Sequence, residues 1–140
     1  FGQANYGAAK TAMVGFMNVL ALEGASHNMR INCLAPGAAT RMTATVPGRP
    51  PIDVDAPPPE RAPSLVTPAV LYMCSEDAPT GRIFQAMGGR FSQAAMYTNP
   101  GVELGTEASF ETFCDNLDTI TDMSAAEDGV AKRARQRSGG

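Results

Sequence analysis

The sequence is poor in the residues that build metal centres and disulfide frameworks. It has three cysteines, Cys33, Cys74 and Cys114, and one histidine, His27, in 140 residues. The cysteines are far apart without a CxxC pair, and the histidine cannot complete a zinc site with them at any usual spacing. We therefore predict no metal site, and we expect buried free thiols in a reducing compartment such as the cytoplasm.

Long apolar runs and an excess of positive charge are also lacking. No apolar run approaches the roughly 18 residues that suggest a membrane span. The 11 basic residues are outnumbered by 14 acidic ones, for a formal net charge of -3, whereas nucleic-acid binding usually needs a net basic surface. We predict no membrane and no nucleic acid as partners. The 44% apolar content is that of a globular protein with one modest core.

The first part of the chain predicts a long helix over about residues 5–23. Its apolar residues recur at three- and four-residue steps, which is helical spacing: Ala9, Met13, Phe16, Met17 and Leu20. This face suits either the core or an interface with another copy of the chain. Gly7 and Gly15 each weaken a helix by up to ~1 kcal/mol relative to alanine, so we expect another element to pack closely there.

A buried strand is predicted next, over "RINCLAP" at residues 30–36, because this short apolar run is closed by Pro36-Gly37. A long helix followed by a buried strand indicates a parallel α/β sheet. Seven of the 11 prolines then fall between residues 46 and 63. That density predicts an irregular loop.

The later segments give weaker signals. We expect a second helix to start at Thr67-Pro68, with the threonine as its cap, and to end near Asp77. "GRIFQAMGG" at residues 81–89 predicts a turn, a short strand and another turn. Residues 109–120 favour a short helix, and residues 131–140 a mobile, solvated tail that could touch an anionic partner.

One pair of residues carries a chemical signal. Tyr6 and Lys10 are four residues apart on the predicted helix, so their side chains project from the same face. A fixed ammonium favours the phenolate form of a nearby tyrosine. Such a tyrosine can exchange a proton with a substrate while a cofactor carries a hydride. The bare pattern is more often only a surface pair.

The wider context of this pair resembles the short-chain dehydrogenase/reductase family. In that family a Tyr-x-x-x-Lys helix precedes a strand ending in Asn-x-x-x-Pro-Gly, as in "GQANYGAAKTAMVGFMNVLALEG" and "RINCLAPGAATRMT" here. "GRIFQAMGG" is similar to the last strand of the family. More narrowly, "NYGAAK", "LAPGAATRMT" and "GRIFQAMGGR" resemble the hydroxyacyl-CoA dehydrogenase domain of peroxisomal multifunctional enzyme type 2 and its bacterial relatives.

The resemblance implies an α/β fold, namely the C-terminal part of a Rossmann-like doubly wound parallel sheet whose N-terminal strands are missing. It covers residues 1–100, with residues 46–63 as the substrate loop and residues 101–140 as a partly helical extension. We prefer a lid for that loop over a motif for a proline-reading partner. A sheet without its first strands exposes edges and apolar surface. We therefore expect this chain alone to be marginally stable, to aggregate or to fold as an oligomer.

The family roles are carried over residue by residue. Tyr6 would be the catalytic acid/base, and Lys10 would hold the nicotinamide ribose and favour the phenolate. Pro36 and Gly37 would bring the backbone close to the nicotinamide.

A threonine that touches the cofactor is harder to place. Thr40 is the nearest match, although its register differs by one from the family spacing because Arg41 occupies that slot. Thr43 is a second candidate.

The sequence also departs from the family pattern, and these departures bear on whether the chain can bind the cofactor alone. The glycine-rich turn that holds a pyrophosphate at a helix N-terminus is absent, and "AMGGR" does not lead from a strand into a helix. The family's catalytic serine and asparagine would precede Phe1. We interpret the chain as a fragment, cut from a longer protein, that is inactive alone.

These observations predict an NAD- or NADP-dependent oxidoreductase. It would transfer a hydride to or from a secondary alcohol or ketone, with a 3-hydroxyacyl-CoA as one candidate substrate. We expect a homo-oligomer that associates through the Tyr6–Lys10 helix. The alternative is a truncated, non-catalytic chain that acts only as an oligomerisation or interaction module.

Overall fold

The computed structural model describes residues 2–46, 48 and 52–129. The chain divides into two compact units, residues 1–94 and 95–140, and each is described by itself. The predicted tail at residues 131–140 lies outside the described residues, as do residues 47 and 49–51 of the proline-rich segment. The assignment of residues 1–100 to one domain stays a prediction.

The predicted first helix is confirmed as α1, Ala4–Glu23, and a 3-10 turn, Gly24–His27, follows it. Only part of its apolar face is covered, since Met17 and Ala21 are buried whereas Met13 is 53% and Phe16 60% exposed. The expected close packing at Gly7 and Gly15 is wrong for the described residues. A Cβ built at either glycine meets nothing within 4 Å.

The predicted strand is observed as β1, Cys33–Gly37, and it starts three residues later than expected. The residues just before β1 form hydrogen bonds with a turn that is distant in the sequence, rather than with a neighbouring strand. The Asn32 side chain donates to the Pro79 carbonyl (2.6 Å) and accepts from the Arg82 N–H (3.1 Å). Asn32 therefore fastens the start of β1 to the segment that leads into β2.

The sheet has the order β1-β2-β3. β2, Ile83–Met87, runs parallel to β1, as predicted. β3, Arg90–Ala94, is antiparallel to β2 and was not predicted, so the described sheet is mixed rather than wholly parallel. The cause is the Gly88-Gly89 pair, with φ of 56° and 75°, because two residues at positive φ make the tight hairpin turn that matches strand twist.

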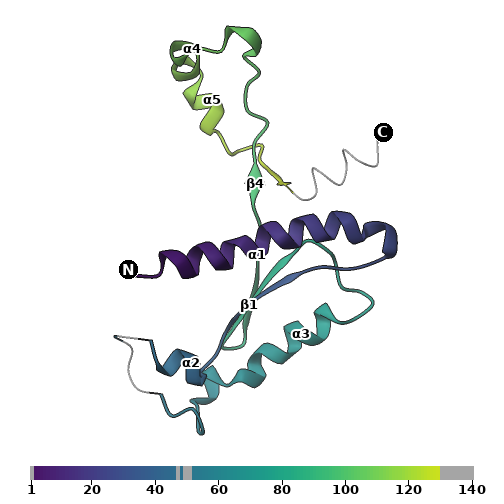
Figure 1. Ribbon diagram of the computed structural model, residues 1–140, viewed down its shortest axis with the longest axis vertical. Coiled ribbons are helices and arrows are strands. Elements are labelled where there is room, and N and C mark those ends of the chain that lie inside the picture. Colours follow the sequence, from purple (N-terminus) through teal and green to yellow (C-terminus); the bar gives the residue numbers. More distant parts are fainter. Residues whose placement is uncertain (1, 47, 49–51, 130–140) are drawn as a thin grey trace. The chain divides into compact units, whose positions relative to one another are not determined.

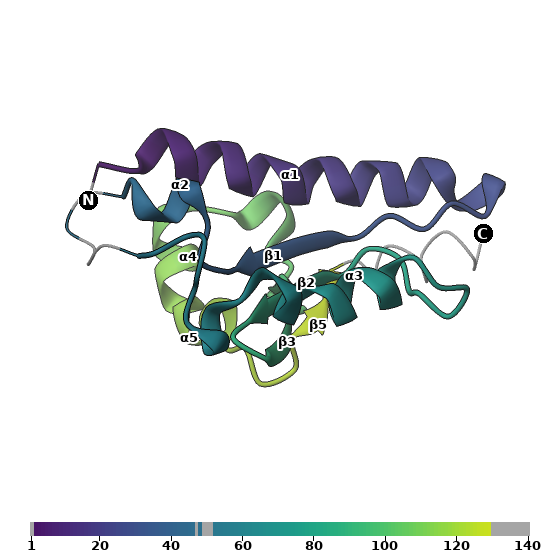
Figure 2. The same ribbon diagram turned by 90° about the horizontal axis from the view of Figure 1, so that it is seen from below.

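The segment between β1 and β2 is largely irregular at its described residues. It contains the short helix α2, Arg41–Ala44, two 3-10 turns, η2 (Pro59–Arg61) and η3 (Pro63–Val66), and the helix α3, Thr67–Met73. In Figures 1 and 2, β1 lies between α1 and α3. A small core joins η3 and α3 to the sheet through Val66, Ala69 and Ala86.

Two expectations about α3 are wrong. Thr67 is not a cap but lies inside the helix, because η3 leads straight into it from Val66, where no side chain caps the turn. The helix also ends at Met73 rather than near Asp77. Residues after it form turns instead, with the Ser75 N–H donating to the Tyr72 carbonyl at 3.1 Å.

The second unit is built from short elements. Strands β4, Tyr97–Thr98, and β5, Glu127–Asp128, pair antiparallel. A 3-10 turn, Gly105–Glu107, precedes the helices α4, Phe110–Asp115, and α5, Leu117–Thr121. The one helix predicted here is broken at Asn116, whose side chain donates to the Thr112 carbonyl at 2.8 Å.

Two further observations concern the whole described chain. The cysteines are less buried than expected, because Cys74 and Cys114 are exposed and only Cys33 is half-buried. Burial raises the pKa of the Cys33 thiol. None of the helices that the structure describes is long and apolar enough to cross a membrane.

Candidate active site

Helix α1 carries the predicted catalytic pair. The Lys10 Nζ atom lies 5.4 Å from the centroid of the Tyr6 ring, within the range of a cation–π interaction. The four-residue spacing produces this contact without help from another element. Tyr6 is 55% exposed, so its hydroxyl is accessible to a ligand. The structure therefore brings Tyr6 and Lys10 together as predicted.

The ends of β1 and β2 place Pro36 and Gly37. Because the two strands are parallel, their carboxyl ends share one edge of the sheet, the usual ligand edge of α/β folds. Gly37 stands opposite Met87 in the register. A Cβ built on Gly37 would lie 2.5 Å from the Met87 Cε atom and 3.1 Å from the Met87 Cβ atom. A larger residue at position 37 would therefore displace Met87.

Thr40 and Thr43 shape the turn that follows β1. Thr40 is the N-cap of α2, and its hydroxyl accepts from the Thr43 N–H at 3.3 Å. In return, the Thr40 N–H donates to the Thr43 hydroxyl at 2.8 Å. This reciprocal cap was not predicted, although two threonines three residues apart are a signal for it.

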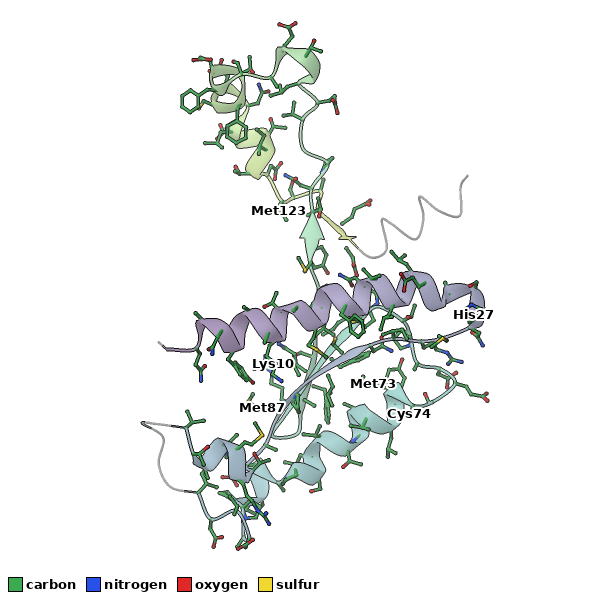
Figure 3. All side chains as sticks on the ribbon, in the orientation of Figure 1. Lys10, His27, Met73, Cys74, Met87 and Met123 are labelled. Carbon is green, nitrogen blue, oxygen red and sulfur yellow. The ribbon has the colours of Figure 1, made fainter. Side chains whose placement is uncertain are left out.

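A cavity of about 490 Å³ opens at this edge. Its lining consists of Pro36, Gly37, Ala38, Thr40, Met42, Thr43, Glu60, Arg61, Met87 and Gly88. The structure thus brings together the predicted residues Pro36, Gly37 and Thr40, with Thr43. Tyr6 and Lys10 are not among the described residues that line it. Figure 3 draws Lys10 and Met87 on the same side of α1.

The 3-10 turn η2 forms a wall of the cavity that was not predicted from the sequence. The Ala39 N–H donates to the Arg61 carbonyl at 2.8 Å, which ties η2 to the segment after β1. The Glu60 carbonyl lies 2.9 Å from the Cβ position of Gly88, just after β2. Glu60 and Arg61 follow a proline run, and no pattern around them signalled a site.

The cavity contains the residues that were predicted to contact a cofactor. Its volume is in the range of small-molecule sites, and Gly37, Thr40 and Thr43 are among its lining residues. Within residues 2–46, 48 and 52–129, no glycine-rich turn leads from a strand into a helix. The same ranges contain no group of His, Cys, Asp and Glu side chains that could hold a metal ion.

A sheet with helices packed on it and a cavity at the carboxyl ends of its parallel strands places this protein in the α/β class. The family model described as short chain dehydrogenase matches residues 1–49. A short-chain type dehydrogenase/reductase of Mycobacterium tuberculosis is 40% identical over 132 residues, which are 91% of this chain and 43% of that protein. Over most of its length the chain is therefore similar to members of the short-chain dehydrogenase/reductase family.

Other comparisons agree with this similarity. An acetoacetyl-CoA reductase of Acinetobacter sp. is 37% identical over 97 residues, 65% of this chain and 39% of that protein. The solved structure of full-length peroxisomal multifunctional enzyme type 2 from Drosophila melanogaster matches with a TM-score of 0.70 at 28% identity, over 99% of this chain and 25% of that one. The chain spans less than half the length of the curated relatives that it matches.

Proposed function

We propose that this chain supplies the proton-transfer residues and the nicotinamide end of the cofactor site of an NAD(P)-dependent oxidoreductase. The observation that carries the proposal is the Lys10 ammonium over the exposed Tyr6 ring, 5.4 Å from its centroid. Its support is the similarity to an oxidoreductase family. Neither NAD nor NADP is favoured by the described residues.

In this mechanism Tyr6 moves the proton. During reduction of a ketone, its hydroxyl donates a proton to the substrate oxygen, and during oxidation of an alcohol the phenolate takes that proton back. The Lys10 ammonium stabilises the phenolate electrostatically. Pro36, Gly37 and Thr40 would hold the nicotinamide, which, when bound, supplies or accepts the hydride.

A 3-hydroxyacyl-CoA and its ketone are the substrates that we favour. The acetoacetyl-CoA reductase relative acts, by its name, on a compound of this class. The cavity also presents two exposed methionines, Met42 at 79% and Met87 at 65%. Methionine adapts to apolar ligands of varied shape, so these side chains suit a flexible acyl group.

We further propose that residues outside this chain supply the glycine-rich turn of the cofactor site, as the length of the relatives suggests. The chain alone would then be inactive. Its free thiols suit a reducing compartment, and we keep the cytoplasm as the proposed location.

The second candidate function is an interaction module that associates through α1. The observation that favours it is the exposed apolar surface of α1, where Met13, Phe16 and Val19 are each more than half exposed. Outside the adjoining backbone of α1 itself, no atom of the described structure lies within 4 Å of a Cβ at Gly7 or Gly15. A second copy could approach this helix closely. Such association is compatible with catalysis as well.

The test is the Tyr6→Phe variant, assayed with acetoacetyl-CoA and NADH or NADPH in the complete protein and in this chain alone. Loss of the hydroxyl should lower kcat in the complete protein at least ~100-fold, as for other proton-transfer residues. Tyr97→Phe is the matched control, because Tyr97 is 57% exposed against 55% for Tyr6. Near-normal turnover by the Tyr6→Phe variant of the complete protein would refute the proposed mechanism. Turnover by this chain alone would refute only the proposal that the chain needs residues outside it for activity.

A further inference from the structure

Arg61 is a cation in the cavity wall that the proposed mechanism does not use. Its side chain is half-buried, and it lines the cavity at the ends of β1 and β2. Across the described ranges, the Arg61 guanidinium has no hydrogen bond or ion pair. The other charged residue of the wall, Glu60, is exposed to solvent.

The backbone of Arg61 is held in place on both sides. Its N–H donates to the Pro58 carbonyl and its carbonyl accepts from the Ala39 N–H, both at 2.8 Å. Fixed backbone on a proline-containing turn lowers the entropy that a ligand contact would otherwise cost. The backbone of Arg61 is thus held at the cavity by η2 rather than left on a free loop.

Arg61 is half-buried as a residue, and its guanidinium has no hydrogen-bond or ion-pair partner among the described residues, so it is available to a ligand in the cavity. Oxygens of a phosphate would pair with it, because the planar guanidinium matches phosphate geometry and forms charge-assisted hydrogen bonds. The other residues that line the cavity favour a ligand that has uncharged parts as well as an anionic group. Apart from Glu60, the other lining residues are uncharged, and they include Met42, Met87 and two threonines.

We propose that Arg61 binds a phosphate group of the ligand that enters this cavity. The inference rests on the proposed function, because both a nicotinamide dinucleotide and a coenzyme A thioester carry phosphates. The shared chemistry is a phosphate oxygen paired with the guanidinium. Figure 3 labels Met87, which marks the position of the cavity on β2.

The experiment measures dissociation constants for NADH, acetoacetyl-CoA and inorganic pyrophosphate, in the complete protein and in this chain. It compares the natural sequence with Arg61→Gln and with Arg61→Lys. The matched control is Arg41→Gln, which removes the same charge from the exposed first residue of α2, outside the cavity lining. Circular dichroism checks that each variant keeps the fold.

We expect Arg61→Gln to weaken one phosphate ligand by about tenfold or more, the scale of a charge-assisted hydrogen bond, and Arg61→Lys to weaken it less. Arg41→Gln should change binding by less than about twofold, as a solvent-exposed charge does. Weaker NADH binding identifies the dinucleotide as the source of the phosphate, and weaker acetoacetyl-CoA binding identifies the thioester.

The two proposals fail in different ways. If both organic ligands bind and Arg61→Gln leaves them unchanged, the role of Arg61 is refuted and the proposed function stands. If neither organic ligand binds but pyrophosphate binds in an Arg61-dependent way, the phosphate site stands and the proposed function is refuted. If none of the three probes binds, both proposals are refuted.

Discussion

The surroundings of Ala86 and the apolar face of α1 are packed to very different degrees. Val66 of η3 and Ala69 of α3 pack against Ala86, which is 0% exposed. On α1, Met17 is 3% exposed while Phe16, one residue earlier, is 60% exposed. Ala86 is thus enclosed within the described chain, whereas α1 has an apolar surface that the described residues of its unit leave open, and α3 also leaves apolar side chains exposed. Large exposed apolar surfaces usually mark a site of further packing.

The same contrast separates the two parts of the candidate site. Tyr6 and Lys10 meet because they are four residues apart on one helix, and their contact needs no other element. The cavity exists only because β1, β2 and η2 converge, through contacts such as Ala39 to Arg61. Changes in β1, β2 or η2 should therefore disturb the cavity and the fold, while changes on the exposed face of α1 should act on catalysis or association.

The largest effect should come from Ala86→Asp. A carboxylate at this fully buried position has no described partner, and burying an uncompensated polar group costs about 3 kcal/mol or more of the free energy of unfolding. Urea denaturation followed by circular dichroism measures the loss. Gln93→Asp, on the exposed part of β3, is the control and should cost little. Equal costs for the two variants would mean that Ala86 is not closely packed.

A pair of glycine substitutions sharpens the comparison. Gly37→Ala places a Cβ against Met87, and we expect overpacking to cost about 1–2 kcal/mol of stability. Gly15→Ala adds a methyl where nothing lies within 4 Å, and helix propensity should add up to ~1 kcal/mol. The same denaturation measurement serves both. A loss of stability for Gly15→Ala would show that α1 is closely covered in solution.

The smallest effect on folding should come from Phe16→Ser, because the side chain is mostly exposed. The free energy of unfolding of the monomer should change by less than about 0.5 kcal/mol, as for other surface substitutions. If copies associate through α1, sedimentation velocity should show a shift toward monomer. Phe110→Ser removes another exposed ring, in the second unit, and should leave association unchanged. An unaltered oligomer in Phe16→Ser would exclude this face as the interface.

Local patterns predicted several elements well, and the reasons are physical. The spacing of apolar residues located α1 within one residue at its start, because a helix is stabilised by its own neighbours. The Pro36-Gly37 pair predicted the end of β1 within one residue. The antiparallel β3 was missed even though Gly88-Gly89 favours a hairpin, since residues 90–94 show no clear alternation of apolar and polar side chains. The ends of α3 depended on η3, a turn that no motif announced.

The residues of the candidate site also divide into those that local motifs predicted and those that only the fold brings together. Sequence motifs identified Tyr6, Lys10, Pro36, Gly37 and Thr40, because each belongs to a pattern of fixed local spacing. They could not identify Arg61 or Met87 as cavity residues, since neither lies in a motif whose spacing marks a ligand contact.

Sequence alone established the α/β class, the family resemblance and the Tyr6–Lys10 pair, all of which depend on residues close together along the chain. Tertiary structure was needed to join the ends of β1 and β2 to η2 into one cavity and to bring Arg61, whose guanidinium has no partner in the described part of the chain, to its wall. It was also needed to show which apolar residues of α1 are covered. The physical reason is that burial and long-range contact depend on how distant segments pack, and local spacing does not encode that packing.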